Sequence, residues 1–93
     1  MGTHQDWFED FVIRVPGVQG GAPVIMGTRT PVGSIISYLR TYGGDQQEVQ
    51  AALSHLMRRE IEAAIAYYDR HAVEVDADLR EHIEARERYL RAV

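Results

Sequence analysis

The spacing of apolar residues along the chain predicts two short strands near the N-terminus and helices after them. A β-prone run over residues 11–15 ends at Pro16-Gly17, and a second run over residues 24–26 ends at Gly27. The glycine-rich stretch between the runs predicts a turn, so we expect a two-stranded ribbon. Because an isolated ribbon is only marginally stable, it should pack on helices or pair with the ribbon of a second chain.

Three helical segments are predicted after the ribbon, each marked by apolar residues three and four positions apart. The first starts at a threonine followed by Pro31, which is typical of a capped helix start, and Gly43 ends it. The second starts at Asp45, which has a glutamate three residues later as in a capping box, and the third covers residues 57–71. The positions predicted to face the core are Val32, Ile35, Ile36, Leu39, Tyr42, Val49, Ala52, Leu53, Met57, Ile61, Ala64, Ile65 and Tyr68. The short connection between the second and third segments favours a helix-turn-helix unit over a four-helix bundle.

The last segment has a different character, with many charges and a narrow apolar stripe. Asp76 or Asp78 can start a final helix, on which Arg86 falls between the apolar residues of one face. An autonomous amphipathic helix would have an apolar residue there. This face therefore either meets a partner with an acidic recess or is a solvated extension. The pattern divides the chain into a leader, residues 1–10, a domain, residues 11–72, and a tail, residues 73–93.

Length and charge limit the functions of the chain. Ninety-three residues form one domain. So short a chain buries only a modest share of its surface on folding, which makes its stability marginal, and we therefore expect a partner. Ten arginines and no lysine stand against 14 acidic residues, and none of the three parts 1–32, 33–72 and 73–93 is net positive. This balance argues against a strong monomeric DNA binder, although a dimer can gather its arginines on one face.

The residue types that support catalysis or metal binding are absent or badly spaced. The chain has no cysteine, which excludes disulfides and thiolate zinc sites and predicts a cytoplasmic protein. Its histidines lack zinc-site spacing, no phosphate-binding loop is present, and the acidic side chains lie near arginines at helical spacing. No apolar run approaches the roughly 20 residues of a membrane span, and the first residues are not a signal peptide. We therefore expect no enzyme activity, metal, cofactor, small-molecule substrate or membrane partner.

The most distinctive stretch, residues 20–32, reads Gly-Gly-Ala-Pro-Val-Ile-Met-Gly-Thr-Arg-Thr-Pro-Val. It resembles the signature of the DUF433 family, in which Gly-x-Pro-x-x-x-Gly-Thr-Arg-x-Pro-Val leads into a helix. Residues 60–68 also resemble the last helix of that family, so the resemblance covers roughly residues 10–75. The family commonly has Leu-Thr where this chain has Leu56-Met57, and the third helix therefore lacks the threonine cap of the family.

The DUF433 family is similar to VapB45-type antitoxins, small dimeric proteins with a winged or homeodomain-like helix-turn-helix that are often paired with a PIN-like ribonuclease toxin. The resemblance implies a mainly α fold, with a short N-terminal β-ribbon, a three-helix helix-turn-helix domain and a C-terminal helical tail. It implies a transcriptional regulator that forms a homodimer, binds its own operator DNA and neutralises the toxin through its tail. The alternative is a protein-interaction module that keeps the helix-turn-helix shape without binding DNA, and the negative charge favours it.

Candidate residues follow from these two activities. The outward face of the third helix would read DNA, with arginines at either end reaching phosphates or guanine edges, unless they only solvate an exposed helix. Arg29, in the loop before the first helix, either anchors a phosphate or ties its loop together. The predicted DNA-binding residues are Arg29, Arg58, Arg59, Glu62, Ala63, Ala66 and Arg70. The predicted toxin-binding residues are Leu79, Ile83, Arg86, Arg88, Leu90 and Arg91. Dimerisation through the ribbon would place two recognition helices about 34 Å apart on the DNA.

Overall fold

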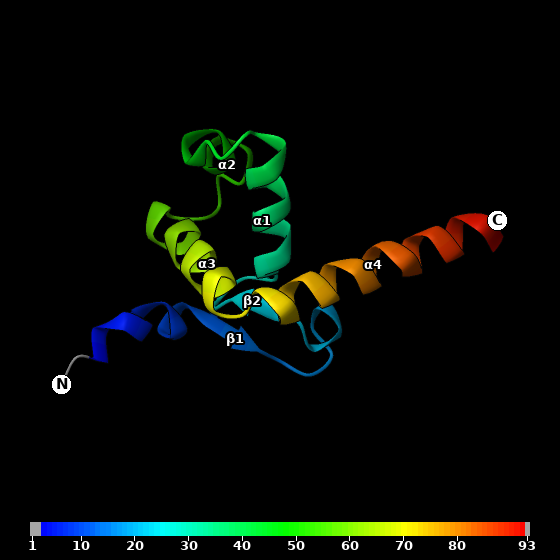
Figure 1. Ribbon diagram of the computed structural model, residues 1–93, viewed down its shortest axis with the longest axis horizontal. Helices are drawn as coiled ribbons and strands as arrows, with labels where there is room; N and C mark the ends of the chain where they lie inside the picture. The colour runs from blue at the N-terminus through cyan, green and yellow to red at the C-terminus, as the bar shows by residue number, and fades with distance from the viewer. Residues whose placement is uncertain (1–2, 93) are drawn as a thin grey trace.

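Short helical turns and two strands precede four α-helices in the computed structural model, which describes residues 3–92 and the side chains of residues 7–81 and 83–92. The elements are η1 (Thr3–Phe11), β1 (Val12–Arg14), η2 (Gln19–Gly21), β2 (Pro23–Ile25), α1 (Val32–Thr41), α2 (Gln46–Ala52), α3 (Arg58–Arg70) and α4 (Ala72–Ala92). Helices α1 to α3 form a body above the strands, and α4 leaves this body and projects to one side (Figure 1). The molecule is therefore elongated, measuring 52 × 28 × 23 Å. A mainly helical chain with a small antiparallel sheet confirms the broad class expected from the sequence.

The predicted ribbon is present and is antiparallel. Val12 pairs with Ile25 and Arg14 with Pro23, and the connection between the strands contains Gly20 at a φ of +65°. Such a φ is unfavourable for residues with a Cβ atom, which explains the glycine in the turn. β2 is buried along its whole length, whereas β1 is partly exposed.

The predicted leader contributes to the core, so the boundary at residue 10 was wrong for its described part. Phe8 is only 4% exposed, and its ring meets that of Tyr67 edge to face at 6.3 Å between centroids. Trp7 packs against the same core and makes edge-to-face contacts with Phe8 and Phe11. η1 therefore forms a cover over α3. Residues 1 and 2 lie outside the described residues.

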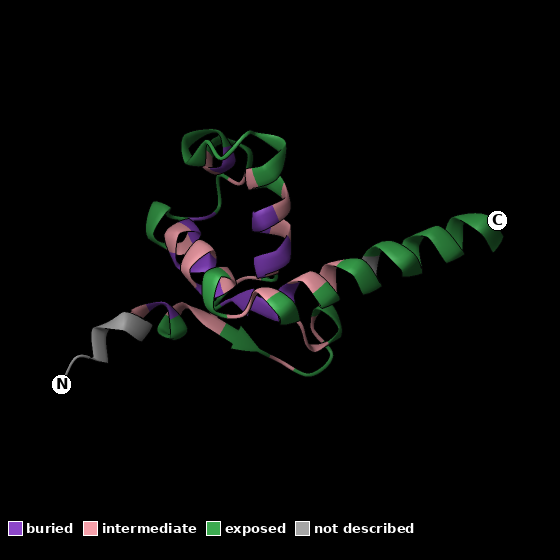
Figure 2. Ribbon diagram, in the orientation of Figure 1, coloured by how far each residue is buried: buried purple, intermediate pink, exposed green. Residues whose placement is uncertain are grey.

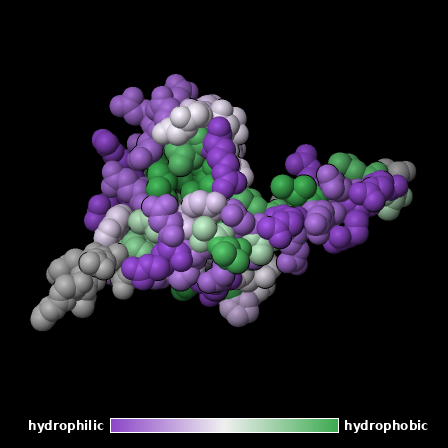
Figure 3. Space-filling view, in the orientation of Figure 1, coloured by the Kyte–Doolittle hydropathy of each residue, from purple (hydrophilic) through white to green (hydrophobic). Residues whose placement is uncertain are grey.

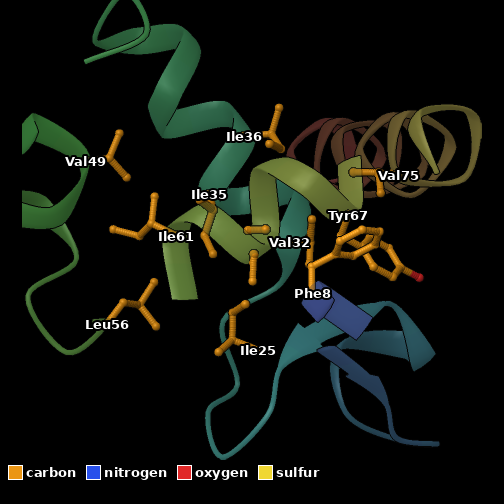
Figure 4. Close-up of a cluster of buried hydrophobic side chains, with 12 residues drawn as sticks. Phe8, Ile25, Val32, Ile35, Ile36, Val49, Leu56, Ile61, Tyr67 and Val75 are labelled. Carbon is orange, nitrogen blue, oxygen red and sulfur yellow. The ribbon is translucent and has the colours of Figure 1, made fainter. Parts of the chain in front are cut away.

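The core joins α1, α2 and α3 through aliphatic side chains predicted from the helical spacing. Ile35 and Ile61 meet between α1 and α3, while Val49 and Leu56 close the side toward α2 (Figure 4). Each of these four side chains is at most 2% exposed. The core prediction was wrong at Met57, which is 60% exposed, and also at Tyr42 and Ala52, which are both exposed.

Of the two adjacent tyrosines of α3, the more deeply buried one is not the one predicted for the core. Tyr67 is buried and Tyr68 is only partly buried, although Tyr68 was assigned to the core. The cause is η1, because Phe8 covers a second face of α3 in addition to the face that packs on α1. Burial raises the pKa of the Tyr67 phenol above its ordinary value, an effect that nearby Arg14 partly offsets.

The helix starts confirm the predicted cap of α2 and correct the predicted cap of α1. Asp45 caps α2, since its carboxylate accepts the N–H groups of Gln47 and Glu48 at 2.9 and 3.2 Å. Thr30 does not cap α1, and its hydroxyl lies 2.7 Å from His55 Nε2 instead. At α3, where the family threonine is missing, the Glu60 carboxylate accepts the N–H of Met57 at 2.7 Å. The Glu60 carboxylate thus supplies the half of a capping box that bonds the N-cap N–H, whereas the Met57 side chain makes no cap hydrogen bond.

The last helix starts earlier than predicted and is partly embedded in the domain. α4 begins at Ala72, directly after a non-helical His71 with φ −124° and ψ 35°, rather than at Asp76 or Asp78. Val75 is buried, and Leu79 packs so closely on α1 that a Cβ atom at Gly33 would lie 3.0 Å from it. The predicted division at residue 72 was therefore misplaced, because the first two turns of α4 belong to the domain.

Candidate protein-binding surface

The part of α4 beyond Leu79, residues 80–92, is here called the arm. Every arm residue whose side chain the structure describes is exposed, and Figure 2 shows the change from buried to exposed along α4. Its large apolar side chains Ile83, Tyr89 and Leu90 are 54, 69 and 62% exposed. Figure 3 shows hydrophobic side chains on the arm among mostly hydrophilic neighbours. Contiguous exposed apolar patches mark interaction sites, whereas single exposed apolar side chains are common on protein surfaces.

The stem of α4, residues 72–79, fixes the direction of the arm through polar contacts as well as packing. Arg14 donates to the Glu74 carboxylate at 2.7 Å, which joins β1 to α4. The Tyr68 hydroxyl donates to the Asp76 carboxylate at 2.9 Å and accepts from Arg40 at 2.6 Å, so one cluster ties α1, α3 and α4 together. The hydrogen bond to Asp76 raises the pKa of Tyr68 above its ordinary value.

One apolar stripe runs from the stem onto the arm. At about 100° of rotation per residue, Val75, Leu79, Ile83, Arg86 and Leu90 fall within about 80° of one another around α4. The first two members are packed against the domain, and the stripe continues without cover in Ile83 and Leu90. We call the exposed part, Ile83, Arg86 and Leu90, the outer stripe.

The structure brings together only half of the predicted toxin-binding residues. Leu79 is committed to its own domain and is not available to a partner. By helical rotation, Arg88 lies opposite the outer stripe and Arg91 about 120° from its centre. Tyr89 was not predicted from the sequence. Its position beside Leu90, in a segment with few apolar residues that could cover it, indicated an exposed aromatic side chain. The charged side chains that the structure describes on the arm make no ion pair with other described residues.

The predicted DNA-reading face of α3 is largely covered. Ala63 is completely buried and Ala66 is partly buried against the core, so the expected open face in the middle of α3 is wrong. The Arg59 guanidinium lies 3.6 Å from the centre of the Trp7 ring, and that of Arg70 lies over Phe8 at 5.9 Å. η1 is again the physical reason, since it occupies the surface that DNA would need.

The remaining predicted DNA-binding residues lie at the first turn of α3 and in a separate loop. Glu62 pairs with both Arg58 and Arg59, at 3.4 and 3.3 Å, which reduces the positive potential there. Arg29 is exposed, and within the described part of the chain it makes no hydrogen bond or ion pair that ties its loop. Thr28 has that role, because its hydroxyl donates to the Ile25 carbonyl at 2.8 Å.

A small hollow of about 120 Å³ separates α2 from the start of α3. It is lined by Gln46, Gln47, Gln50, Arg58 and Ile61. Glutamine and arginine are side chains that hydrogen-bond base edges in DNA. The hollow lies away from the arm, so the two surfaces are separate.

Neither metal sites nor membrane spans are found in what the structure describes. Among the described residues, no group of three or more histidine or acidic side chains is placed to hold a metal ion. The helices of residues 3–92 also lack the combination of length and apolar character that crossing a bilayer requires.

Comparison with known proteins gives a family and a solved relative. The chain matches the family model described as "Protein of unknown function (DUF433)" over residues 12–68, which spans both strands, α1, α2 and most of α3. It is similar to a DUF433 member protein from Anabaena variabilis ATCC 29413 of known crystal structure, with 28% identity over 80% of this chain and 72% of that chain, and a TM-score of 0.68. No curated protein matches it. The family model therefore covers well over half of the chain, and this chain belongs to the DUF433 family.

Proposed function

We propose that this protein is an antitoxin-like protein-binding module, whose domain presents the arm to a partner protein. One observation carries the proposal: an arm of about 20 Å exposes Ile83, Tyr89 and Leu90 on a helix that is fixed at its base. This reading develops the protein-interaction alternative and keeps the antitoxin role of the tail. It places the binding energy in α4 rather than in α3.

The energetics of an isolated helix support a partner. A helix shorter than about 12–15 residues is marginal in water, and the arm has only its attachment to the stem for support. Complete burial of an aliphatic side chain such as Ile83 or Leu90 contributes about 1.5–3 kcal/mol. Because these two residues are seven positions apart on one face, they match the anchor spacing of a helix that binds in an apolar groove.

Arg86 specifies the chemistry of that groove. It lies between Ile83 and Leu90, so a partner that covers both residues also removes the guanidinium from water. This cost is offset only when a carboxylate pairs with the guanidinium. A metal-dependent nuclease has a recess lined by the carboxylates that hold its cation, and these could pair with Arg86. We therefore propose a PIN-like ribonuclease toxin in the cytoplasm as the partner.

The test is first whether the adjacent reading frame encodes a PIN-like ribonuclease, and then whether this protein captures that ribonuclease, measured by titration calorimetry and by RNA cleavage. We expect the double variant Ile83→Ser/Leu90→Ser and the single variant Arg86→Glu each to weaken binding at least about tenfold, because anchors in a covered interface dominate affinity. Val73→Ser is the matched control, since Val73 is 85% exposed on another side of α4 and should bind like the wild type. Unchanged RNA cleavage with wild-type protein would refute toxin neutralisation, and equal loss in all variants would place the contact elsewhere.

Operator DNA is a second candidate ligand, favoured by the hollow between α2 and α3. Its three glutamines and Arg58 offer base-reading side chains between α2 and the first turn of α3. This proposal replaces the middle of α3 with its first turn as the reading surface.

A titration against DNA from the protein's own promoter across a salt series tests this second candidate. If Arg58 neutralises a phosphate, Arg58→Ala should reduce the slope of log K against log salt by about 1, whereas Arg80→Ala on the arm should not. Absent binding, or binding that does not respond to salt, would contradict the DNA proposal and leave the protein-binding proposal standing.

A further inference from the structure

A groove of about 500 Å³ lies between the η2 turn, the start of α1 and the stem of α4. On the α4 side its wall consists of Asp78, Glu81 and Ala85, with Leu79 and Val75 behind them. Among the side chains that the structure describes, two carboxylates and no basic group line this groove. The groove therefore favours a positively charged occupant.

Asp78 has a buried oxygen atom at this groove that is unpaired among the described residues. Its Oδ2 atom is withdrawn from solvent, yet it has no hydrogen-bond partner in the described part of the protein. Buried polar atoms in folded proteins almost always have a partner, because leaving one unpaired costs about 1–3 kcal/mol. A cationic donor entering the groove would remove this cost.

The charges of α4 identify an occupant for the groove within the same sequence. Residues 72–82 contain four acidic residues and one arginine, whereas residues 83–93 contain three arginines and two acidic residues. The helix is thus acidic near the domain and basic at its far end. Arg88 lies ten residues beyond Asp78, about 15 Å along a straight helix, so its side chain does not reach Asp78 of its own chain. A second copy that lies antiparallel brings its basic end to this acidic end.

The residues involved lie on one face of α4. Asp78, Glu81, Ala85 and Arg88 follow one another at intervals of three and four residues, the spacing of a helix stripe. We call them the charged stripe, and its centre is about 140° around the helix from that of the outer stripe. Ala85 lies in the middle, where a small side chain lets two helices approach closely, since the distance between axes depends on the side chains at the contact.

We propose that two copies of the chain pair antiparallel through their charged stripes, with Arg88 of each copy in the groove of the other. The guanidinium would donate to Asp78 and Glu81 of the second copy, and the two-fold symmetry would make this contact twice. The outer stripe remains outside the contact. The proposal therefore goes beyond the protein-binding function and does not depend on it.

The association of the full-length protein, measured by sedimentation equilibrium, tests this pairing. Glu81→Arg and Arg88→Glu should each raise the dimer dissociation constant at least about tenfold, because each brings like charges together at both symmetric contacts. The combined variant Glu81→Arg/Arg88→Glu should recover much of the association, since the pair is restored with its charges exchanged. Higher salt should weaken the wild-type dimer.

Arg86→Glu is the matched control, because it reverses a charge of the same type on the same helix but in the outer stripe. It should leave association unchanged, and circular dichroism of all four variants should show the wild-type helix content. A monomeric wild-type protein overturns the proposal. A dimer that neither single reversal weakens also overturns it and favours a contact elsewhere, such as the predicted pairing of ribbons through β1. Toxin capture is measured separately, by calorimetry and RNA cleavage. Arg86→Glu is expected to weaken capture while leaving the association of the two copies unchanged, so the two proposals fail independently.

Discussion

Replacing Ile61 with alanine should lower the free energy of unfolding by about 2–5 kcal/mol, the cost of removing a large aliphatic side chain from a core. Ile61 is 1% exposed and lies between α1 and α3, near Ile35, Val49 and Leu56 (Figure 4). The truncated side chain leaves a cavity that neighbouring helices fill only in part. Since domains are stable by only about 5–15 kcal/mol, this one change should be visible in a urea unfolding curve.

The chain contains a matched control for this prediction. Ile83→Ala removes the same atoms from an isoleucine on the arm, where the side chain is already exposed. Its effect on the unfolding free energy should stay within about 0.5 kcal/mol, as for most surface substitutions. Equal losses for Ile61→Ala and Ile83→Ala would contradict the assignment of one to the core and the other to the surface.

Replacing Gly33 with valine should separate the stem of α4 from α1 and lower the unfolding free energy by about 1–3 kcal/mol, the usual cost of overpacking. A Cβ atom at this position would lie 3.0 Å from both Cγ and Cδ2 of Leu79. A gain of up to about 1 kcal/mol from replacing a helical glycine opposes the clash. The branched valine is chosen because its added volume outweighs that gain.

A double-mutant cycle shows whether the clash with Leu79 causes the loss of stability in Gly33→Val. In a Leu79→Ala background the space opposite Gly33 is open, so Gly33→Val should cost much less there than in the wild type. The unfolding free energies of the two single variants and the double variant give this difference directly. Strict additivity would mean that the valine is destabilising for another reason.

The helices and strands were predictable because their signals are local. Turn glycines, the Asp45 cap and the apolar spacing of α1 and α3 act within a few residues, and each element formed near its predicted place. The errors in burial have a different origin. Tyr67 is buried because Phe8, more than fifty residues earlier, packs against its ring, and no local spacing contains that contact.

The candidate surface was predictable only in part for the same reason. The outer stripe was visible as a helical repeat with Arg86 in its middle, and the structure keeps Ile83 and Leu90 exposed. Leu79 packs against the domain because Gly33, forty-six residues away, has no side chain to block it. The groove at Asp78 is formed by three separate segments, so it had no signal in the sequence.

Trp7 gives the molecule a built-in optical probe. It is the single tryptophan of the chain, and it lies beneath the Arg59 guanidinium and against two phenylalanine rings. Its indole fluorescence therefore comes from the junction of η1 and α3. A shift in that emission when another molecule is added would register movement of η1 away from α3, in solution and without any label.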